Sequence, residues 1–168
     1  VISGYNPSRK FRFKTRYRQR RPTRPSRPDL EPGDVISGKA YVTDGDGVKV
    51  AGYVVRIAGI DAPEWDQIAK TSDHRWINHG SRVKSVLIRE IGGKYVNIVA
   101  EGYDRYGRVL GTVDKDGRDI GAWLVENGHA IAAYSNRYRH LQREAWQARR
   151  GMWGYASATD PRYWRRAN

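Results

Sequence analysis

Short runs of alternating apolar and polar residues, separated by turn residues, dominate the chain from residue 35 onward. Segments with this strand-like pattern are Ile36–Thr43, Val48–Val50, Tyr53–Ala58, Tyr95–Ala100 and Arg108–Val113. Asp-Gly and Ala-Gly pairs, which favour tight turns, separate the first three. The pattern therefore predicts five short β-strands.

Helical periodicity appears in three places farther along the chain. Apolar residues recur on one stripe of Gly80–Gly93, and the Gly pair that follows Ile91 is a good C-terminal stop. Asp119 is a suitable N-cap for a short helix that ends before Gly128. A last helix is predicted over about Tyr138–Arg150. Five short strands with inserted and appended helices make an α+β domain, and a small barrel avoids exposed strand edges.

The chain divides into three parts by composition. We expect a basic Arg/Pro-rich arm at residues 1–34, a globular domain at 35–155 and a C-terminal tail at 156–168. Between Arg9 and Arg27 ten residues are Lys or Arg and none is acidic, which indicates a flexible arm rather than a packed element. Basic and mostly aromatic residues nevertheless alternate over 10–20, so docking as an edge strand or against single-stranded nucleic acid stays open.

Charge and cysteine content narrow the class of protein. The formal net charge is +13, which favours a polyanionic partner, with nucleic acid first and an anionic membrane surface second. The absence of cysteine excludes disulfides, thiolate catalysis and Cys-based metal sites. No apolar run is long enough to span a bilayer.

Three segments concentrate charged residues where strands end. They are Asp44–Gly47, Val54–Glu64 and Asp104–Arg108. Taken singly, they are compatible with a hairpin turn, an edge strand with an acidic exit loop, and a surface turn. Taken together, they supply the carboxylates and guanidinium groups that phosphodiester hydrolysis requires. Carboxylates bind a hard cation such as Ca²⁺ or accept a proton from water, and guanidinium forks bind phosphate oxygens in pairs.

The same segments resemble those of a known family. The stretches VTDGDGVKV, VVRIAGIDAPE and DRYGRVLGTV resemble the three signature blocks of the staphylococcal nuclease (thermonuclease) family, in the right order. LVENGHAIAAY and AWQARRGMW are similar to its second and third helices. The resemblance covers roughly 36–153. It implies a five-stranded OB-fold β-barrel with three helices, and Ca²⁺-dependent cleavage of DNA and RNA on the 5′-oxygen side that leaves 3′-phosphates.

The resemblance also implies roles for individual residues. Asp46 and Asp61 would be the carboxylate ligands of Ca²⁺, and Ala62 would contribute its backbone carbonyl. Glu64 would be the general base for the attacking water. Gly47 departs from the Thr that the family usually has there, which puts the strength of metal binding in doubt.

The remaining implied roles concern the substrate. Arg56 and Arg108 would bind and stabilise the scissile phosphate. Tyr106 and Tyr134 match nucleotide-contacting tyrosines, and Arg105 joins them as a substrate-binding residue. Residues 65–79 have no clear counterpart in the family.

The main alternative is a non-catalytic OB-fold module that only binds nucleic acid. A pure binder needs basic residues but not three acids along the path of a phosphate, so we favour the nuclease. We expect a monomer that acts on single-stranded or locally open DNA and RNA, with the arm adding phosphate contacts. Calcium dependence favours work outside the cytoplasm, with secretion, the periplasm and an anchor upstream of Val1 all left open.

Overall fold

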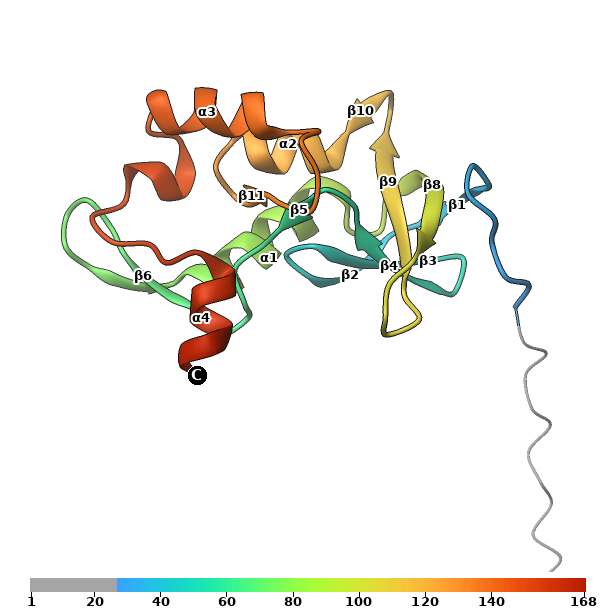
Figure 1. Ribbon diagram of the computed structural model, residues 1–168, viewed down its shortest axis with the longest axis horizontal. Helices are drawn as coiled ribbons and strands as arrows, with labels where there is room; N and C mark the ends of the chain where they lie inside the picture. The colour runs from blue at the N-terminus through green and yellow to red at the C-terminus, as the bar shows by residue number, and fades with distance from the viewer. Residues whose placement is uncertain (1–26) are drawn as a thin grey trace, which may run out of the picture.

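A curled β-sheet forms the centre of the computed structural model, which describes residues 27–168 (Figure 1). Its strand order is β1-β8-β9-β4-β3-β2, with β10 paired to β9. The strands are β1 (Val35–Lys39), β2 (Tyr41–Asp44), β3 (Gly47–Val50), β4 (Tyr53–Ile57), β8 (Tyr95–Tyr103), β9 (Val109–Lys115) and β10 (Arg118–Asp119). The neighbours β4 and β9 are parallel, and the other pairs in this sheet are antiparallel. The predicted α+β class and OB-type curled sheet are confirmed.

Helices and two small sheets surround this curled sheet (Figure 1). The small sheets pair β5 (Ile60–Asp61) with β11 (Ile131–Ala132), and β6 (Ile68–Lys70) with β7 (Trp76–Asn78). The helices are α1 (His79–Ile91), α2 (Ile120–Glu126), α3 (Arg139–Gln147), α4 (Pro161–Ala167) and the 3-10 turn η1 (Gly151–Gly154). The segment that had no counterpart in the family is thus mostly the β6–β7 hairpin, which leads directly into α1.

The structure refines the predicted elements at three points. The strand predicted over 36–43 is broken at Ala40 into β1 and β2. The Ala40 amide donates to the Lys94 carbonyl, and its carbonyl accepts from the Gly93 amide, so Ala40 continues neither strand. The helix predicted to reach Arg150 ends at Gln147, and Arg149 then takes a left-handed φ of 55°. A fourth helix, α4, forms within the segment predicted as a tail.

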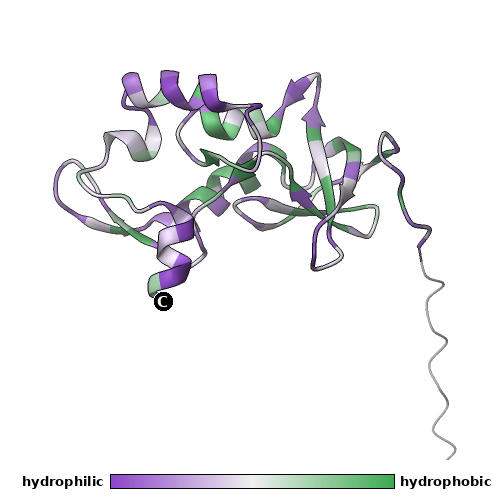
Figure 2. Cartoon of the chain, in the orientation of Figure 1, coloured by the Kyte–Doolittle hydropathy of each residue, from purple (hydrophilic) through white to green (hydrophobic). Residues whose placement is uncertain are grey.

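Alternating burial along the strands builds the hydrophobic core. On β8, Val96, Ile98 and Ala100 face inward while their neighbours are exposed, as a half-buried strand requires. Leu87 of α1 and Leu124 of α2 close the core from the helical side. Figure 2 shows that the outer side of α3, which faces away from the core, is hydrophilic.

The end of the basic arm, at residues 28–30, contacts the barrel. The Pro28 carbonyl accepts a hydrogen bond from the Tyr53 hydroxyl at 2.9 Å, and the Leu30 amide donates to the Tyr103 hydroxyl at 2.8 Å. The alternating segment 10–20 lies outside the described residues. Within residues 27–168, no helix combines the length and the apolar character needed to cross a membrane.

His79, at the start of α1, is buried with both ring nitrogens unpaired among the described residues. Its ring packs edge-on against Tyr155, with centroids 5.3 Å apart. Burial, and then the neighbouring His129 and Arg82, lower the pKa of His79 from 6.5 to about 4. The fold therefore favours the neutral imidazole.

This burial predicts acid-sensitive stability. Because the folded-state pKa lies below the unfolded value, the contribution of neutral His79 is complete above about pH 6.5 and is lost as the pH falls towards 4. When the pH is lowered from about 7.5 to 4.5, the free energy of unfolding should fall by about 2 kcal/mol less in the His79→Leu variant than in the wild type. Urea unfolding at both pH values measures this difference. The exposed His140→Ala variant should keep the wild-type pH dependence, and an unchanged slope in His79→Leu would contradict the assignment.

Candidate active site

The tight turn between β2 and β3 brings Asp46 against the end of β5. A Cβ on Gly45 would lie 2.9 Å from the Ala62 Cβ and 3.1 Å from Val83, so only glycine allows this approach. The Ala62 amide is 3.4 Å from Asp46 Oδ2 and donates to it, while the Asp46 carbonyl accepts from the Ile57 amide at 2.9 Å. The turn is therefore fixed to the loop that carries the other acids.

Arg56 bridges the two aspartates. Its Nη2 lies 3.3 Å from Asp46 Oδ2 and 3.2 Å from Asp61 Oδ1. Asp61 is fully buried and Asp46 nearly so. Burial raises the pKa of Asp46 although Arg56 opposes the shift. Burial alone would lower the pKa of Arg56, but the neighbouring Asp46 and Asp61 raise it. One cationic nitrogen contacts both carboxylates, so the two acids are close enough to share a single cation.

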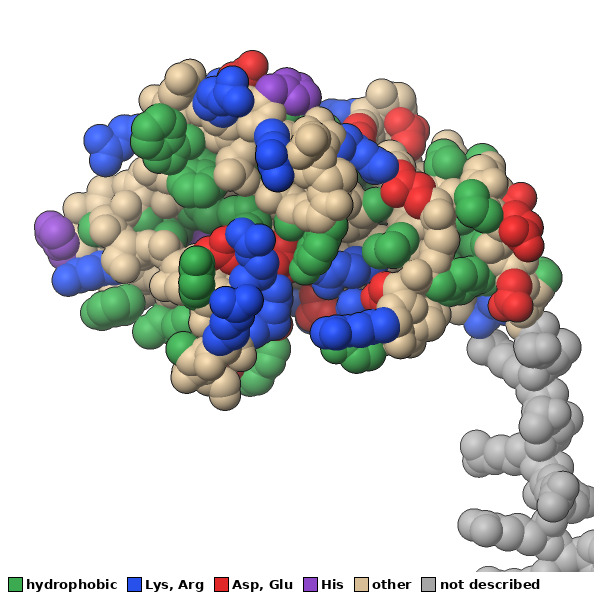
Figure 3. Space-filling model, in the orientation of Figure 1, with side chains coloured by type: hydrophobic (Ala, Val, Ile, Leu, Met, Phe, Trp, Pro, Cys, Tyr) green, Lys and Arg blue, Asp and Glu red, His purple; other side chains and the backbone are tan. Residues whose placement is uncertain are grey.

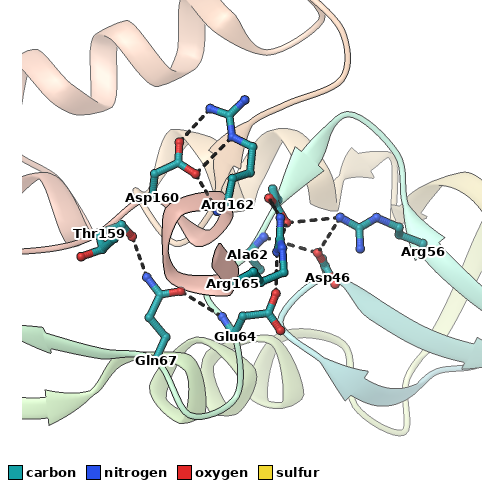
Figure 4. A network of polar contacts seen from close by, with 10 residues as sticks. Asp46, Arg56, Ala62, Glu64, Gln67, Thr159, Asp160, Arg162 and Arg165 are labelled. Carbon is teal, nitrogen blue, oxygen red and sulfur yellow. Dashed lines mark hydrogen bonds and ion pairs between the residues drawn. The ribbon is translucent and has the colours of Figure 1, made fainter. Parts of the chain in front are cut away.

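Arg165 of α4 is a second cation at these acids, and the sequence reasoning missed it. Its Nη2 lies 2.7 Å from Asp61 Oδ2, and its Nη1 lies 3.2 Å from Asp61 Oδ1 and 2.5 Å from Glu64 Oε1 (Figure 4). The hydrogen bonds to Asp61, against the opposing effect of burial, raise the pKa of Arg165. The two carboxylates therefore face a guanidinium that comes from about one hundred residues farther along the chain.

Gln67 fixes the loop that carries Glu64. This fully buried side chain accepts from the Glu64 amide at 3.1 Å and donates to the Thr159 carbonyl at 2.6 Å. Its backbone amide also donates to the Glu64 carbonyl at 2.9 Å, and its carbonyl accepts from the His79 and Gly80 amides. A single glutamine in an unmatched segment gives no signal in the sequence, because its link to Thr159 joins residues distant in the chain.

The turn between β8 and β9 presents the second predicted phosphate-binding arginine. Asp104 accepts from the Arg108 Nε at 2.7 Å and from the Arg108 and Tyr106 amides at 2.9 Å. Although burial opposes the shift, the hydrogen bonds from Arg108 lower the pKa of Asp104, which keeps it ionised. The Arg105 and Arg108 guanidinium carbons lie 4.9 and 5.5 Å from the centre of the exposed Tyr106 ring. Among the described residues, the Nε is the side-chain nitrogen through which Arg108 donates a hydrogen bond.

A cavity of about 810 Å³ collects these side chains. Of the residues predicted for the site, it is lined by Asp46, Arg56, Ala62, Glu64, Arg105, Tyr106, Arg108 and Tyr134. Tyr134 is largely exposed, and its ring centre lies 5.5 Å from the Arg56 guanidinium carbon. Asp61 does not line the cavity, because it is buried behind the arginines that pair with it. Figure 3 shows basic side chains lying against acidic ones in the region that α4 occupies in Figure 1.

The donor set fits a hard cation only in part. No three His, Asp or Glu side chains among residues 27–168 gather closely enough to hold a metal ion. Two carboxylates that already share the Arg56 nitrogen, with the adjacent Ala62 carbonyl, are the oxygen donors that Ca²⁺ selects, and water completes such sites. The residues therefore supply two carboxylates and one carbonyl for such an ion, and water would have to complete its coordination.

Comparison with known proteins identifies the family. The family model described as "Staphylococcal nuclease homologue" matches residues 54–155, more than half of the chain. The chain belongs to the staphylococcal nuclease family. The resemblance drawn from its sequence motifs is thereby confirmed. The match ends before α4, so Arg165 lies outside the part that the family model covers.

Three relatives illustrate the range of proteins that carry this staphylococcal nuclease domain. An uncharacterized endonuclease of Escherichia coli is 34% identical over 143 residues, covering 79% of this chain and 86% of its own length. The succinoglycan biosynthesis protein ExoI of Rhizobium meliloti is 30% identical over 132 residues, covering 74% and 68%. A probable staphylococcal-like nuclease of Oryza sativa subsp. japonica is 32% identical over 118 residues, covering 68% of this chain but 29% of the rice protein. Family membership supports a nuclease function at the level of the family.

The contact between α1 and the acidic loop gives a test of the site's packing. A Cβ on Gly80 would lie 1.6 Å from the Glu64 carbonyl oxygen, so Gly80→Ala must displace the loop. We expect this variant to lower the free energy of unfolding by about 1–3 kcal/mol, measured by urea unfolding. Gly38→Ala is the matched control, because its Cβ would meet nothing closer than 3.4 Å. Equal losses in both variants would contradict the close approach.

Proposed function

We propose that this chain is a calcium-dependent endonuclease that hydrolyses DNA and RNA on the 5′-oxygen side of the phosphodiester and leaves 3′-phosphates. The observation that carries the proposal is the bridge of Arg56 to Asp46 and Asp61, beside the cavity that also contains Glu64 and Arg108. Membership of the nuclease family supports hydrolysis of nucleic acid. The net charge of +13 supports attraction of a polyanion.

Asp46, Asp61 and the Ala62 carbonyl would hold the cation. A hard cation bound there supplies Lewis-acid chemistry, namely polarisation of a phosphate oxygen and acidification of water. Glu64 accepts the proton of the water whose oxygen attacks phosphorus. The bond from phosphorus to the 5′-oxygen breaks, the leaving oxygen takes up a proton, and the phosphate stays on the 3′-oxygen.

Arginine and aromatic side chains account for substrate binding. Arg56 and Arg108 bind the scissile phosphate, because guanidinium groups pair with its oxygens and stabilise the charge of the transition state. The exposed rings of Tyr106 and Tyr134 offer stacking surfaces for bases, with Arg105 beside the first of them. Bases are free to stack only when unpaired, so single-stranded or locally open substrates are favoured.

Removal of calcium tests the metal requirement. EGTA should abolish cleavage of single-stranded DNA and RNA by the chelator-treated chain, and added CaCl₂ should restore it. The products should carry 3′-phosphates, so a polymerase extends them only after phosphatase treatment. Cleavage that persists in excess EGTA would contradict the metal assignment. Salt-dependent binding without cleavage under any condition would favour the non-catalytic OB-fold module.

Loss of the general base should impair turnover more than binding. We expect Glu64→Gln to lower kcat by about 10²-fold or more, with little change in the affinity for a non-cleavable oligonucleotide. Glu101→Gln is the matched control, because Glu101 also lines the cavity, pairs with Arg137 and has the same side-chain exposure of 34%. Single-turnover kinetics measure the step directly. Equal losses in the two variants would assign the effect to charge rather than to proton transfer.

A further inference from the structure

The C-terminal helix places a cation on the oxygens that a metal ion would need. Arg165 contacts both oxygens of Asp61 and one oxygen of Glu64, at 2.5 to 3.2 Å. Asp61 Oδ1 also accepts from Arg56, so every Asp61 oxygen already has a guanidinium partner. Figure 4 shows Arg165 between Glu64 and the pair of Asp46 and Arg56.

Few contacts hold this helix in place. In α4 only Pro161 is buried, and Tyr163 is 64% exposed. Besides those of Arg165, the one side-chain hydrogen bond from α4 to residues 27–159 is that of the half-buried Trp164, whose indole N–H lies 3.3 Å from Asp66 Oδ1. A short helix that buries little apolar surface opens at low free-energy cost. The ion pairs of Arg165 are therefore a principal fastening of α4 to the body.

The segment that precedes the helix is fixed more firmly. The backbones of Lys70 and Ser157 exchange two hydrogen bonds of 2.8 and 3.1 Å, and Gln67 donates to the Thr159 carbonyl. These contacts anchor the segment up to Thr159 against the β6–β7 hairpin. A hinge thus follows Thr159, and α4 can leave the acids while the residues before it stay bound.

A divalent cation and the Arg165 guanidinium cannot both be accommodated favourably on Asp61. Like charges repel strongly at such distances away from bulk water. Asp61 is fully buried, so solvent screens the repulsion weakly on its side, while the Arg165 side chain is 37% exposed. The Arg56 contact uses one oxygen of each aspartate, whereas Arg165 takes both oxygens of Asp61 and reaches Glu64 as well.

We propose that Arg165 competes with the divalent cation for Asp61 and Glu64, and that α4 is a lid that cation binding releases. This rests on the proposed function, because the cation in question is the one that the nuclease would use. In the closed state both the metal site and the general base are neutralised by the same side chain. The lid therefore couples the opening of the site to the arrival of the ion.

Calorimetric titration of chelator-treated full chain with CaCl₂ tests the competition. The apparent Kd falls as the fraction of open molecules rises. Arg165→Ala, which removes the competing cation, should therefore bind Ca²⁺ about tenfold more tightly than the wild type. Arg166→Ala is the matched control, because this neighbour lies over the Tyr163 ring rather than on the acids, and it should keep the wild-type Kd. An equal or higher Kd in Arg165→Ala would overturn the lid and make Arg165 a residue that positions the acids.

Hydrogen exchange on the unmodified chain gives an independent readout. Calcium should increase exchange of the amides in 161–168 while those of the β6–β7 hairpin stay protected, and unchanged or greater protection of α4 would overturn the proposal. If the wild type binds Ca²⁺ and cleaves DNA but Arg165→Ala has an unchanged Kd, the lid proposal is wrong and the proposed function stands. Failure of every variant to bind Ca²⁺ removes the proposed function and the lid together.

Discussion

Two carboxylates buried behind the surface must be neutralised, and the rest of the site follows from this requirement. An ionised group that leaves water is tolerated only when it is paired and hydrogen-bonded. Asp61 is fully buried and Asp46 almost so, and Arg56 lies within 3.3 Å of both. Loss of one partner from such a buried pair typically costs about 3–5 kcal/mol. Removal of one of the side chains that define the site is therefore also expected to destabilise the domain.

The register of the central sheet places this arginine between the two turns that carry the candidate site residues. Arg56 on β4 is opposite Gly47 on one side and Leu110 on the other. The first neighbour directly follows Asp46, and the second lies just after Arg108, at the start of β9. The last residues of β4 pair in parallel with the first residues of β9, so the strand that leads into the acidic loop ends beside the strand that follows Arg108. The OB-type topology thus brings together residues that lie far apart in the sequence.

Much of this arrangement could be predicted from the sequence because local physics determines it. The alternating pattern of β8 and the Asp119 cap, which accepts from the Ala122 amide, depend on neighbours only a few residues away. The break at Ala40 could not be predicted, because it is set by bonds to the residues after α1. Helix α4 did leave a local signal, an Asp160 N-cap followed by a proline at the first position, but its seven residues are too few to show a useful periodicity. Arg165 and Gln67 gave no such signal. Asp61 lies about one hundred residues from Arg165, and Thr159 lies about ninety residues from Gln67.

The balance of charge in the cavity links the buried acids to substrate attraction. A chain with a net charge of +13 attracts polyanions over its whole surface, yet Asp46, Asp61 and Glu64 would repel a phosphate at the point where it must bind. Arg56 offsets part of this negative charge, Arg165 offsets more of it while α4 is closed, and Arg108 bonds to Asp104 through its Nε. A phosphate that enters the cavity therefore meets guanidinium groups rather than bare carboxylates. Arg165 comes from beyond the segment that the family model matches, so the electrostatics of this candidate site depend on the C-terminal helix as well as on the barrel.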